Sequence, residues 1–365
     1  MSRMTVMSPH LTSPHLTSPK RAPRRSLAVG VARRLCVAPM MGYTDRHFRY
    51  LLRLLSPNAL LYTEMITTGA LLHGDERALT HDSAEQPTAL QLGGCDPRAL
   101  ARAAELGEHA GFAELNLNVG CPSPRVASAR FGACLMADPG LVADCVSAMR
   151  GASHLPVTVK CRLGIDDNDN YEFLARFVAA LDRAGADALI VHARIALLDG
   201  LTPEQNREIP PLDYDRVQRL RNDFAALPVV LNGGLRCIDG VAAALTWADG
   251  VMVGRAACSD PLFIARLDAH VYGTTVPDEH DVLRRYCAYA RRRLAAGDTF
   301  GPIAKGILGL FTGRPGARAF RRDVTSAIQR RAHDPDTLLD AANHVTEAHR
   351  APLLRVDYNV ASAML

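Results

Sequence analysis

Eight short apolar runs recur along the chain, and segments of helical length that are rich in Ala and Leu separate them. Most of the runs are continuously apolar, as expected for parallel strands that are buried on both faces. We predict strands at 35–40, 60–65, 88–94, 114–120, 157–164, 188–194, 229–234 and 250–255. Eight β/α units over roughly 220 to 250 residues are the number and size of a TIM barrel, so the pattern predicts an α/β fold of the (β/α)8 type.

A doubly wound open sheet is the alternative. That fold usually has fewer strands and a Gly-rich turn after its first strand, where this chain has Ala38-Pro39-Met40-Met41-Gly42. From about residue 280 the strand pattern stops, and segments 282–296 and 336–349 predict helices. Breaks are expected at Gly301-Pro302 and at Arg314-Pro315-Gly316. We therefore divide the chain into a tail (1–34), a TIM barrel catalytic domain (35–280), a small helical domain (281–350) and a C-terminal tail (351–365).

The composition is that of a globular protein. With 365 residues, of which 48% are hydrophobic and 22% charged, the chain can bury one large core or two smaller ones. No apolar stretch approaches the roughly 18 residues that cross a bilayer, so no membrane span is expected. The nine cysteines include no CxxC pair, which argues against a disulfide framework and a zinc ribbon. We predict no metal site and a reducing, cytoplasmic setting.

The net charge of +4 is unevenly distributed. Residues 1–34 carry seven Lys/Arg and no acid, 35–280 carry 21 against 30 acids, and 281–350 carry 13 against 7. The Pro-, Ser- and Arg-rich tail cannot build a core, so we expect it to be disordered. A basic segment that follows an acidic body suggests an anion-binding accessory to a catalytic domain, although such charges can also simply solvate a surface.

Polar residues or glycines end nearly every predicted strand, at the barrel edge where TIM-barrel chemistry takes place. A single polar residue at a strand end is ordinarily a satisfied side chain, but a set that recurs at all eight ends indicates a functional ring. Its members are Pro39 and Met40, Glu64, Gln91, Asn116 and Asn118, Lys160 and Arg162, His192 and Arg194, Asn232-Gly233-Gly234, and Gly254-Arg255.

The glycines after the last two predicted strands predict a phosphate site. Gly233-Gly234 and Gly254 let backbone N–H groups approach an anion, and Arg255 can add a charged donor. If the phosphate belongs to flavin mononucleotide (FMN), Gln91 and Lys160 can hydrogen-bond the polar edge of the ring. The polarizable Met40 side chain can then support one ring face, although a strand methionine is ordinarily part of the core.

The segment from Asn116 to Ser123 is the most specific in the chain. It ends the fourth predicted strand, turns at Gly120 and places the Cys121 thiol on a loop above the barrel mouth. A thiol there can act as a nucleophile or as a general acid. The nucleophile requires a nearby base and an oxyanion hole, whereas the acid requires only an acceptor carbon below it.

Eight motifs spread over the chain share the pattern of one enzyme family. They are Ala38-Pro39-Met40, Thr63-Glu64-Met65, Gln91-Leu92-Gly93-Gly94, Asn118 to Ser123, Phe131 to Met136, Val159-Lys160, His192-Ala193-Arg194 and Asn232-Gly233-Gly234. The set resembles the tRNA-dihydrouridine synthases. Two more stretches resemble the A subfamily: Gly200 to Pro203 with Asn206 to Leu212, and Gly309-Leu310-Phe311 with Pro315 to Arg318. The resemblance covers roughly residues 35–350.

This resemblance implies an FMN-dependent oxidoreductase that uses NADPH to reduce the C5–C6 bond of uridines in the tRNA D-loop, at positions 20 and 20a. Reduced FMN would deliver hydride to C6, and Cys121 would protonate C5. The resemblance places FMN against Ala38, Pro39, Met40, Gln91, Lys160, His192, Asn232, Gly233, Gly234, Gly254 and Arg255.

Two departures from the subfamily pattern affect the substrate side. The loop after Ser123 has Pro124 to Ala129 where the subfamily commonly has Asp-Arg-Val-Gln followed by a small residue and Gly. Glu204 stands where the subfamily commonly has Lys in a stretch associated with tRNA contact.

We expect tRNA to contact the helical domain, where Arg318 and Arg321 are three residues apart and share a helix face. The expected tRNA contacts are Asn118, Glu204, Arg207, Arg318 and Arg321, and no obligatory protein partner is expected. A flavin oxidoreductase of free pyrimidines, similar to dihydroorotate dehydrogenase, is one alternative, although it needs no basic appendage. A non-catalytic RNA-binding barrel is the other, and the intact ring of polar strand ends argues against it.

Overall fold

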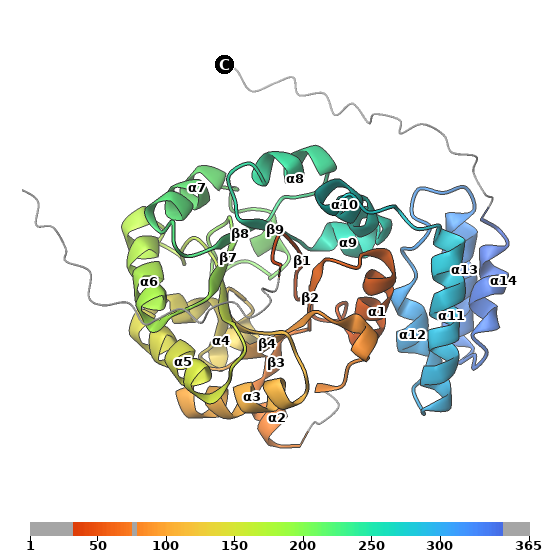
Figure 1. Ribbon diagram of the computed structural model, residues 1–365, viewed down its shortest axis with the longest axis horizontal. Coiled ribbons are helices and arrows are strands. Elements are labelled where there is room, and N and C mark those ends of the chain that lie inside the picture. Colours follow the sequence, from red (N-terminus) through yellow and green to blue (C-terminus); the bar gives the residue numbers. More distant parts are fainter. Residues whose placement is uncertain (1–31, 75–78, 346–365) are drawn as a thin grey trace, which may run out of the picture.

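The computed structural model describes residues 32–74 and 79–345, and in this part of the chain eight parallel strands close into a barrel (Figure 1). The strands are β1 (Leu35–Val37), β2 (Leu60–Tyr62), β4 (Thr88–Gly93), β5 (Glu114–Val119), β6 (Val157–Cys161), β7 (Ala188–His192), β8 (Val229–Asn232) and β9 (Gly250–Val253). They follow the order β2-β1-β9-β8-β7-β6-β5-β4, and β2 pairs with β4 to close the ring. The short β3 (Ile66–Thr67) pairs with the end of β4. The predicted TIM barrel is confirmed, and the open sheet is excluded.

Every barrel strand begins at the residue where its predicted apolar run begins. The strands end one to three residues earlier than predicted. The last residues of each predicted run leave the strand ladder and form the rim of the barrel, whereas Gln91, Lys160, His192 and Asn232 still belong to strands. Alternate side chains of one strand point to opposite faces. The inner face therefore carries a small apolar set of its own, made of Cys36, Ala38, Leu60, Tyr62, Ala89, Ile190, Val230 and Met252.

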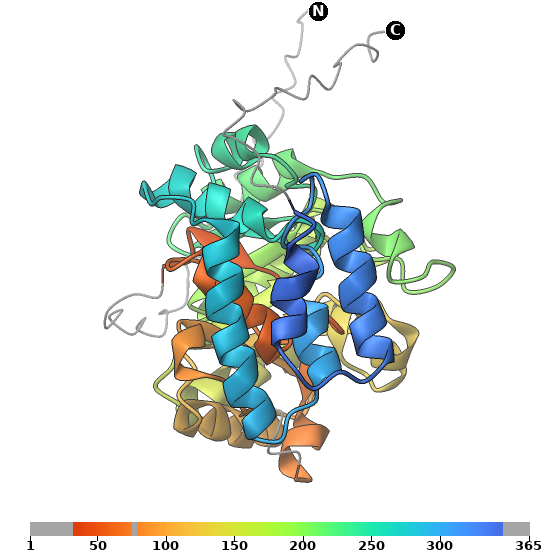
Figure 2. The same cartoon turned by 90° about the vertical axis from the view of Figure 1, so that its right-hand side faces the viewer.

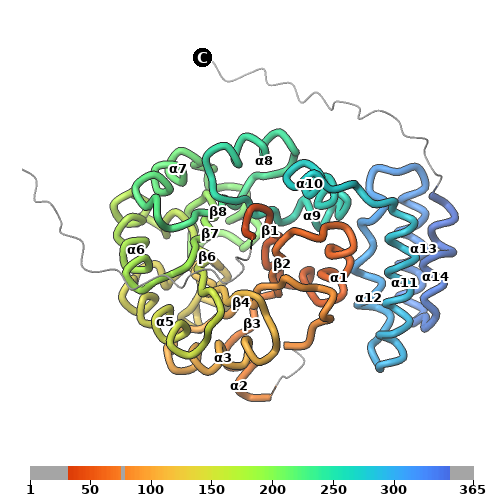
Figure 3. Tube along the Cα trace, viewed as in Figure 1, coloured from red at the N-terminus to blue at the C-terminus, as the bar shows by residue number. Residues whose placement is uncertain are grey.

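Helices between the strands cover the outside of the barrel, as the tube in Figure 3 shows. They are α1 (Arg46–Leu55), α2 (Thr68–Leu72), α3 (Pro97–His109), α5 (Pro139–Ala152), α6 (Tyr171–Ala184), α7 (Tyr214–Asp223), α8 (Ile238–Ala244) and α10 (Leu262–Tyr272). The loops add α4 (Pro124–Ser128), α9 (Arg255–Ser259) and the 3-10 turns η2 (Ser83–Glu85), η3 (Gly132–Ala137) and η4 (Gln205–Arg207). Side-chain caps begin several helices. Asp45 accepts from the N–H of Phe48 at the start of α1, and Asp96, which directly precedes Pro97, accepts from the N–H of Arg98 at the start of α3.

Four further helices form a layer against one side of the barrel, which faces the viewer in Figure 2. They are α11 (Glu279–Ala295), α12 (Phe300–Gly306), α13 (Ala317–Gln329) and α14 (Asp336–Ala342). Helices α11 and α12 pack on α1. In this contact the Tyr50 and Tyr289 rings stack with their centroids 3.8 Å apart, and His47 Nδ1 lies 2.8 Å from the Tyr289 hydroxyl.

The helices expected beyond residue 280 are present, with differences at their ends. Helix α14 begins at Asp336 as predicted and ends at Ala342, and residues 346–349 of that prediction lie outside the described residues. The predicted break at Gly301-Pro302 is wrong, because the two residues lie in the first turn of α12, where proline is well tolerated. The break at Arg314-Pro315-Gly316 is confirmed, and Gly316 has a φ of +87° just before α13. The division into separate domains stays a prediction.

The boundary of the basic tail needs a correction. Residues 1–31 and 346–365 lie outside the described residues, but Arg33, which we assigned to the tail, belongs to the barrel. Its Nε donates to the Glu114 carboxylate at 2.6 Å, and the Glu114 side chain is fully buried. The Tyr62 and Thr158 hydroxyls donate to the other carboxylate oxygen at 2.7 and 2.6 Å. A buried charge requires such partners, so this corner of the barrel holds Arg33 in place.

Within residues 32–74 and 79–345, no helix combines the length and the apolar character that crossing a membrane requires.

We predict that Glu114→Ala destabilises the protein strongly. The substitution leaves the Arg33 guanidinium buried without its counter-ion, and breaking a buried pair typically costs about 3–5 kcal/mol. The measurement is the free energy of unfolding in urea. Glu105→Ala is the matched control, because it removes the exposed Arg102–Glu105 pair, which typically contributes less than about 1 kcal/mol. Equal losses in the two variants would contradict a structural role for the Glu114 carboxylate.

Candidate active site

A cavity of about 600 Å³ opens at the carboxyl ends of the barrel strands. Its size is in the usual range for cofactor and ligand sites. It is lined by Cys121, by three of the five residues expected to contact tRNA (Asn118, Glu204 and Arg207), and by every residue that the sequence assigned to the cofactor: Ala38, Pro39, Met40, Gln91, Lys160, His192, Asn232, Gly233, Gly234, Gly254 and Arg255. Arg318 and Arg321 are not among the residues that line it. They border a separate hollow of about 360 Å³ at the start of α13.

The loop after β5 holds Cys121 at the mouth through its backbone. The Asn118 Oδ1 atom accepts from the N–H groups of Gly120 at 3.2 Å and Cys121 at 3.0 Å. On the other side the Cys121 carbonyl accepts from the Ala133 N–H at 2.9 Å. A Cβ atom on Gly132 would lie only 2.6 Å from that carbonyl oxygen, so glycine allows η3 to approach the loop. The Cys121 side chain remains partly exposed toward the cavity.

A chain of hydrogen bonds runs from this loop into the barrel. The Asn118 Nδ2 donates to Gln91 Oε1 at 2.9 Å, and Gln91 Nε2 donates to Asn116 Oδ1 at 2.8 Å. The Asn116 Nδ2 donates to the Thr158 hydroxyl at 2.9 Å, and that hydroxyl donates to the Glu114 carboxylate. Each donor points toward the carboxylate, so the chain is fully satisfied and its bonds reinforce one another. Asn118, an expected tRNA contact, therefore also positions the thiol loop.

The departure at Pro124 has a local explanation. Pro124 is the first residue of α4, where a helix needs no N–H group. Val126 in the same helix is buried, and it contacts the position that a Cβ atom on Gly132 would occupy. The replaced segment thus forms a short helix directly behind the Cys121 loop.

Lys160 and His192 rise from β6 and β7 into a strongly cationic environment. The Lys160 ammonium donates to Asn232 Oδ1 at 2.9 Å, and Asn232 in turn donates to the Met252 carbonyl at 2.8 Å. Burial, with the nearby Arg162 guanidinium, lowers the pKa of Lys160 to about 8. Burial and the charges of Arg162 and Lys160 also hold the pKa of His192 well below its usual range, so its imidazole is neutral at pH 7.

Arg162 joins two loops of the rim. It is almost fully buried, and its Nε donates to the Gly120 carbonyl at 3.1 Å, next to Cys121. Its Nη1 donates to the carbonyls of Ile195 at 3.1 Å and Asn206 at 2.9 Å in the loop between β7 and α7. The sequence marks Arg162 as a strand-end residue but gives it no role, because both loops it joins lie far from it in the chain.

The Gly233-Gly234 pair forms a close backbone approach to the cavity. Gly233 has a φ of +108° and Gly234 a φ of +73°, and a side chain on Gly233 would meet His192 Cδ2 at 2.6 Å. The Gly233 carbonyl accepts from the Tyr214 hydroxyl at 2.7 Å. Neither glycine N–H donates to another group in the described part of the chain. Such N–H groups beside arginines fit a phosphate.

Arg207, Arg236 and Arg255 line the cavity together with this glycine pair, and Arg194 interacts electrostatically with Arg236 and Arg255. Of these four arginines, the sequence assigned a role to Arg207 and Arg255 alone. Arg255 pairs with Glu208 at 2.6 Å, so its charge is partly neutralised within the protein. Arg194 donates to the Glu208 carbonyl at 3.0 Å, and within the described residues the Nε atoms of Arg194 and Arg207 are buried without a partner. Arg236 also lines the cavity. Arg236 could have been predicted as a cavity residue from the sequence, because it follows Gly234 by two residues.

Met40 lies against the cavity as expected for a support of a planar ligand. Its N–H donates to the Thr44 hydroxyl at 2.9 Å, and its carbonyl accepts from the N–H groups of Tyr43 and Thr44. The sulfur lies 3.6 Å from Cys258 Sγ, a second thiol on the cavity wall that the sequence analysis did not single out. Burial raises the pKa of Cys258 to about 12, so this thiol is unreactive at neutral pH.

Among the described residues, no group of three or more His, Cys, Asp or Glu side chains is arranged to hold a metal ion.

Comparisons with known proteins agree on one family. The family model "Dihydrouridine synthase (Dus)" matches residues 36–349. A tRNA-dihydrouridine(20/20a) synthase of Pseudomonas syringae pv. tomato is 50% identical over 323 residues, which are 88% of this chain and 96% of that protein. A protein of the same name from Escherichia coli strain K12 is 49% identical over 317 residues, covering 86% of this chain and 92% of that protein.

A solved structure of 2-naphthoyl-CoA reductase in complex with 2-naphthoyl-CoA matches with a TM-score of 0.51 and 10% identity. The match covers 66% of this chain and 50% of that chain, and it supports the barrel fold alone. By contrast, the matches to the family model and to the two relatives cover both the barrel and C-terminal helices. The chain therefore belongs to the dihydrouridine synthase family.

Proposed function

We propose that this protein is an FMN-dependent tRNA-dihydrouridine synthase, which reduces the C5–C6 bond of uridines 20 and 20a in the tRNA D-loop with NADPH as the electron source. The observation that carries the proposal is the Cys121 thiol, held at the mouth of a cationic cavity whose glycines leave two backbone N–H groups for an anion. The names of the relatives, which specify positions 20 and 20a, support the choice of target.

The cavity has the groups that FMN requires. The N–H groups of Gly233 and Gly234 would bind the phosphate, with Arg255 and Arg236 beside them. Gln91, Lys160, His192 and Asn232 would face the polar edge of the ring, while Ala38, Pro39, Met40 and Gly254 would form the apolar side. When bound, the flavin supplies the hydride that adds to C6 of uracil.

The role of Cys121 is to donate a proton to C5. Its backbone is held by hydrogen bonds on both sides, so the thiol has a defined position above the cavity. A nucleophile would also require a base beside it, whereas a proton donor needs only correct placement. Hydride at C6 and a proton at C5 together complete the reduction of the double bond, and solvent reprotonates the thiol.

The uridine must leave its stack to enter a cavity inside the barrel mouth. Arg207 and Glu204 border the entrance, and Arg318 and Arg321 lie outside it on α13. Of the four arginines clustered after Gly313, Arg314 pairs with Glu279 and Arg322 pairs with Asp323. Arg318 and Arg321 form no ion pair within the described residues, so they are available for RNA phosphates.

The nine free cysteines fit a reaction in a reducing compartment, the cytoplasm. The direct test of the function uses purified protein, NADPH and tRNA that lacks dihydrouridine. The expected result is dihydrouridine at positions 20 and 20a, detected by mass spectrometry. Reduction of a free pyrimidine instead of tRNA would identify the alternative flavin oxidoreductase, and a colourless protein without activity would identify a non-catalytic RNA-binding barrel.

We predict that Lys160→Ala releases most of the flavin. Lys160 is charged below about pH 8 and neutral above it, so the flavin affinity of the unmodified protein should fall as the pH rises through 8. The variant should bind weakly at every pH. The measurement is FMN binding by fluorescence from pH 6 to 9.5. Full flavin occupancy in the variant, together with normal reduction by NADPH, would remove Lys160 from the set of ring contacts.

Cys121→Ala should leave FMN content and NADPH oxidation intact while dihydrouridine formation falls about 10²- to 10⁴-fold, the usual effect of losing a general acid. Single-turnover assays with pre-reduced enzyme measure the step directly. Cys258→Ala is the matched control. It removes a second thiol of the cavity, the one next to Met40, and should retain activity. Unmodified rates in Cys121→Ala would assign the proton donor to another group.

The double variant Arg318→Ala/Arg321→Ala should weaken tRNA binding and flatten its salt dependence by roughly one unit of slope for each lost phosphate contact. Flavin content and NADPH oxidation should not change, because neither arginine lines the main cavity. Labelled tRNA titrated at several salt concentrations provides the measurement. Arg322→Ala serves as the control, since its guanidinium is already paired with Asp323. An unchanged slope in the double variant would place the RNA elsewhere, and Arg207 at the cavity would be the next residue to test.

A further inference from the structure

Large apolar side chains that remain exposed are concentrated around the cavity. Of the six found within the described residues, Met41 and Tyr43 lie in the loop after β1, and Ile209 and Leu212 lie in the loop between β7 and α7. Both loops contribute to the cavity lining, and Tyr43 and Met41 themselves line it. Tyr43 is 56% exposed and Met41 is 63% exposed. A cluster of exposed apolar groups beside a binding site indicates a surface for a ligand.

The turn that carries Tyr43 is held from two sides. Gly42 has a φ of +75°, and its N–H donates to the Glu64 carboxylate at the end of β2. Its carbonyl accepts from the Lys305 ammonium on α12 at 2.7 Å. The N–H groups of Tyr43 and Thr44 both donate to the Met40 carbonyl. The tyrosine is therefore displayed on a rigid turn, and little conformational freedom is lost when a ligand binds to it.

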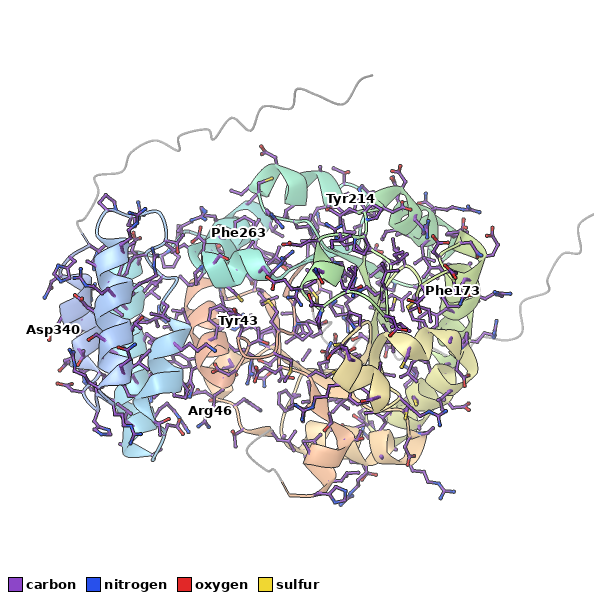
Figure 4. The ribbon with its side chains drawn as sticks, turned by 180° about the vertical axis from the view of Figure 1, so that it is seen from behind. Tyr43, Arg46, Phe173, Tyr214, Phe263 and Asp340 are labelled. Carbon is purple, nitrogen blue, oxygen red and sulfur yellow. The ribbon has the colours of Figure 1, made fainter. Side chains whose placement is uncertain are left out.

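A cation and an aromatic ring meet at this point of the rim. The Lys305 ammonium lies 5.4 Å from the centroid of the Tyr43 ring, within the range of a cation–π contact. Figure 4 shows Tyr43 on the side of the barrel that faces the C-terminal helices. The ring therefore lies between the cavity, where the uridine is reduced, and the α11–α14 layer, where Arg318 and Arg321 are found. Aromatic rings beside cations are the usual platform for unpaired RNA bases.

We propose that Tyr43 stacks on the unpaired base next to the uridine that enters the barrel. This inference rests on the proposed function, because it assigns a further contact to the same substrate. Extracting one base removes a stacking partner from its neighbour, and the exposed Tyr43 ring replaces that partner. The Lys305 ammonium attracts the adjoining phosphate and fixes the turn. Tyr43 is thus a substrate-positioning residue that contacts RNA without contacting the reacting carbons.

A double-mutant cycle between protein and RNA tests the contact. Tyr43→Ala should weaken tRNA binding about tenfold, within the range measured for stacking of one base, while flavin content and thermal stability stay unchanged. Tyr43→Phe should retain the affinity of the unmodified protein, since stacking needs the ring and not the hydroxyl. A tRNA with an abasic site at the 5′ or the 3′ neighbour of the target uridine should lose the same affinity. With Tyr43→Ala, that abasic tRNA should bind no more weakly than intact tRNA.

Additive losses for both neighbours would overturn the proposal, because the ring and the base would then act independently. An unchanged affinity in Tyr43→Ala would overturn it as well, and would assign the exposed rim to another partner. Val276→Ala, which truncates an exposed apolar residue that does not line the cavity, is the control and should bind tRNA normally. The unmodified protein is assayed for dihydrouridine formation in parallel. Its inactivity would refute the proposed function, whereas activity without coupling would refute only the stacking contact.

Discussion

The position of the thiol depends on a carboxylate at the opposite end of the barrel. Glu114 is fully buried, and Arg33, Tyr62 and Thr158 all donate to its carboxyl group, which supplies the partners that a buried polar group requires. From Thr158 the hydrogen bonds continue through Asn116, Gln91 and Asn118 to the backbone of Cys121. Three members of this hydrogen-bond chain come from β5: Glu114, Asn116 and Asn118. They lie on the same face of the strand because strand residues two apart share a face. The barrel interior therefore holds an apolar set that comes from β1, β2, β4, β7, β8 and β9 and a polar chain that comes from β4, β5 and β6.

Uncompensated positive charge is the second constraint on the site. Lys160, Arg162, Arg194, Arg207, Arg236 and Arg255 gather near the mouth. Burial, together with the charge of neighbouring cations, lowers the pKa values of Lys160, Arg162, Arg194 and His192. Two carboxylates accompany these cations: Glu204 lines the cavity, and Glu208 has its pKa lowered by its hydrogen bond to Arg255. An anionic ligand relieves this repulsion, which is why the same residues suit both a cofactor phosphate and an RNA backbone. Burial keeps His192 neutral, so it acts as a hydrogen-bonding group and not as a further cation.

The C-terminal helices contribute to the barrel mouth as well as to a separate surface. Helices α11 and α12 both pack on α1, where Tyr289 of α11 stacks on Tyr50. Lys305 of α12 reaches the turn at Gly42 on the rim. This hydrogen bond connects α12 to the loop after β1. On α13, by contrast, Arg318 and Arg321, which form no ion pair within the described residues, border a hollow of their own. A substrate that contacts both surfaces must be large, and an RNA with an unstacked nucleotide is such a substrate.

The sequence by itself determined the barrel, because a buried parallel strand needs a continuous apolar run, and each of the eight runs begins where its strand begins. It also determined the strand-end residues that line the cavity, since residues that follow parallel strands meet at one edge of the sheet. It did not identify Arg236, Cys258 or Tyr43, which line the same cavity. Tertiary structure decided the rest through contacts between distant segments. Arg33 belongs to the barrel because it pairs with Glu114, which is 81 residues away in the chain. Arg314 forms an ion pair that Arg318 does not form within the described residues, because Glu279 lies next to Arg314 in the folded protein. Glu64 and Lys305 fix the turn of Tyr43 through the Gly42 backbone, and the Met40 carbonyl accepts from the Tyr43 N–H. Apart from the Lys305 ammonium at its face, the ring is left 56% exposed. Periodicity reports which face of an element is buried, but not which distant residue will neutralise a charge or leave a ring uncovered.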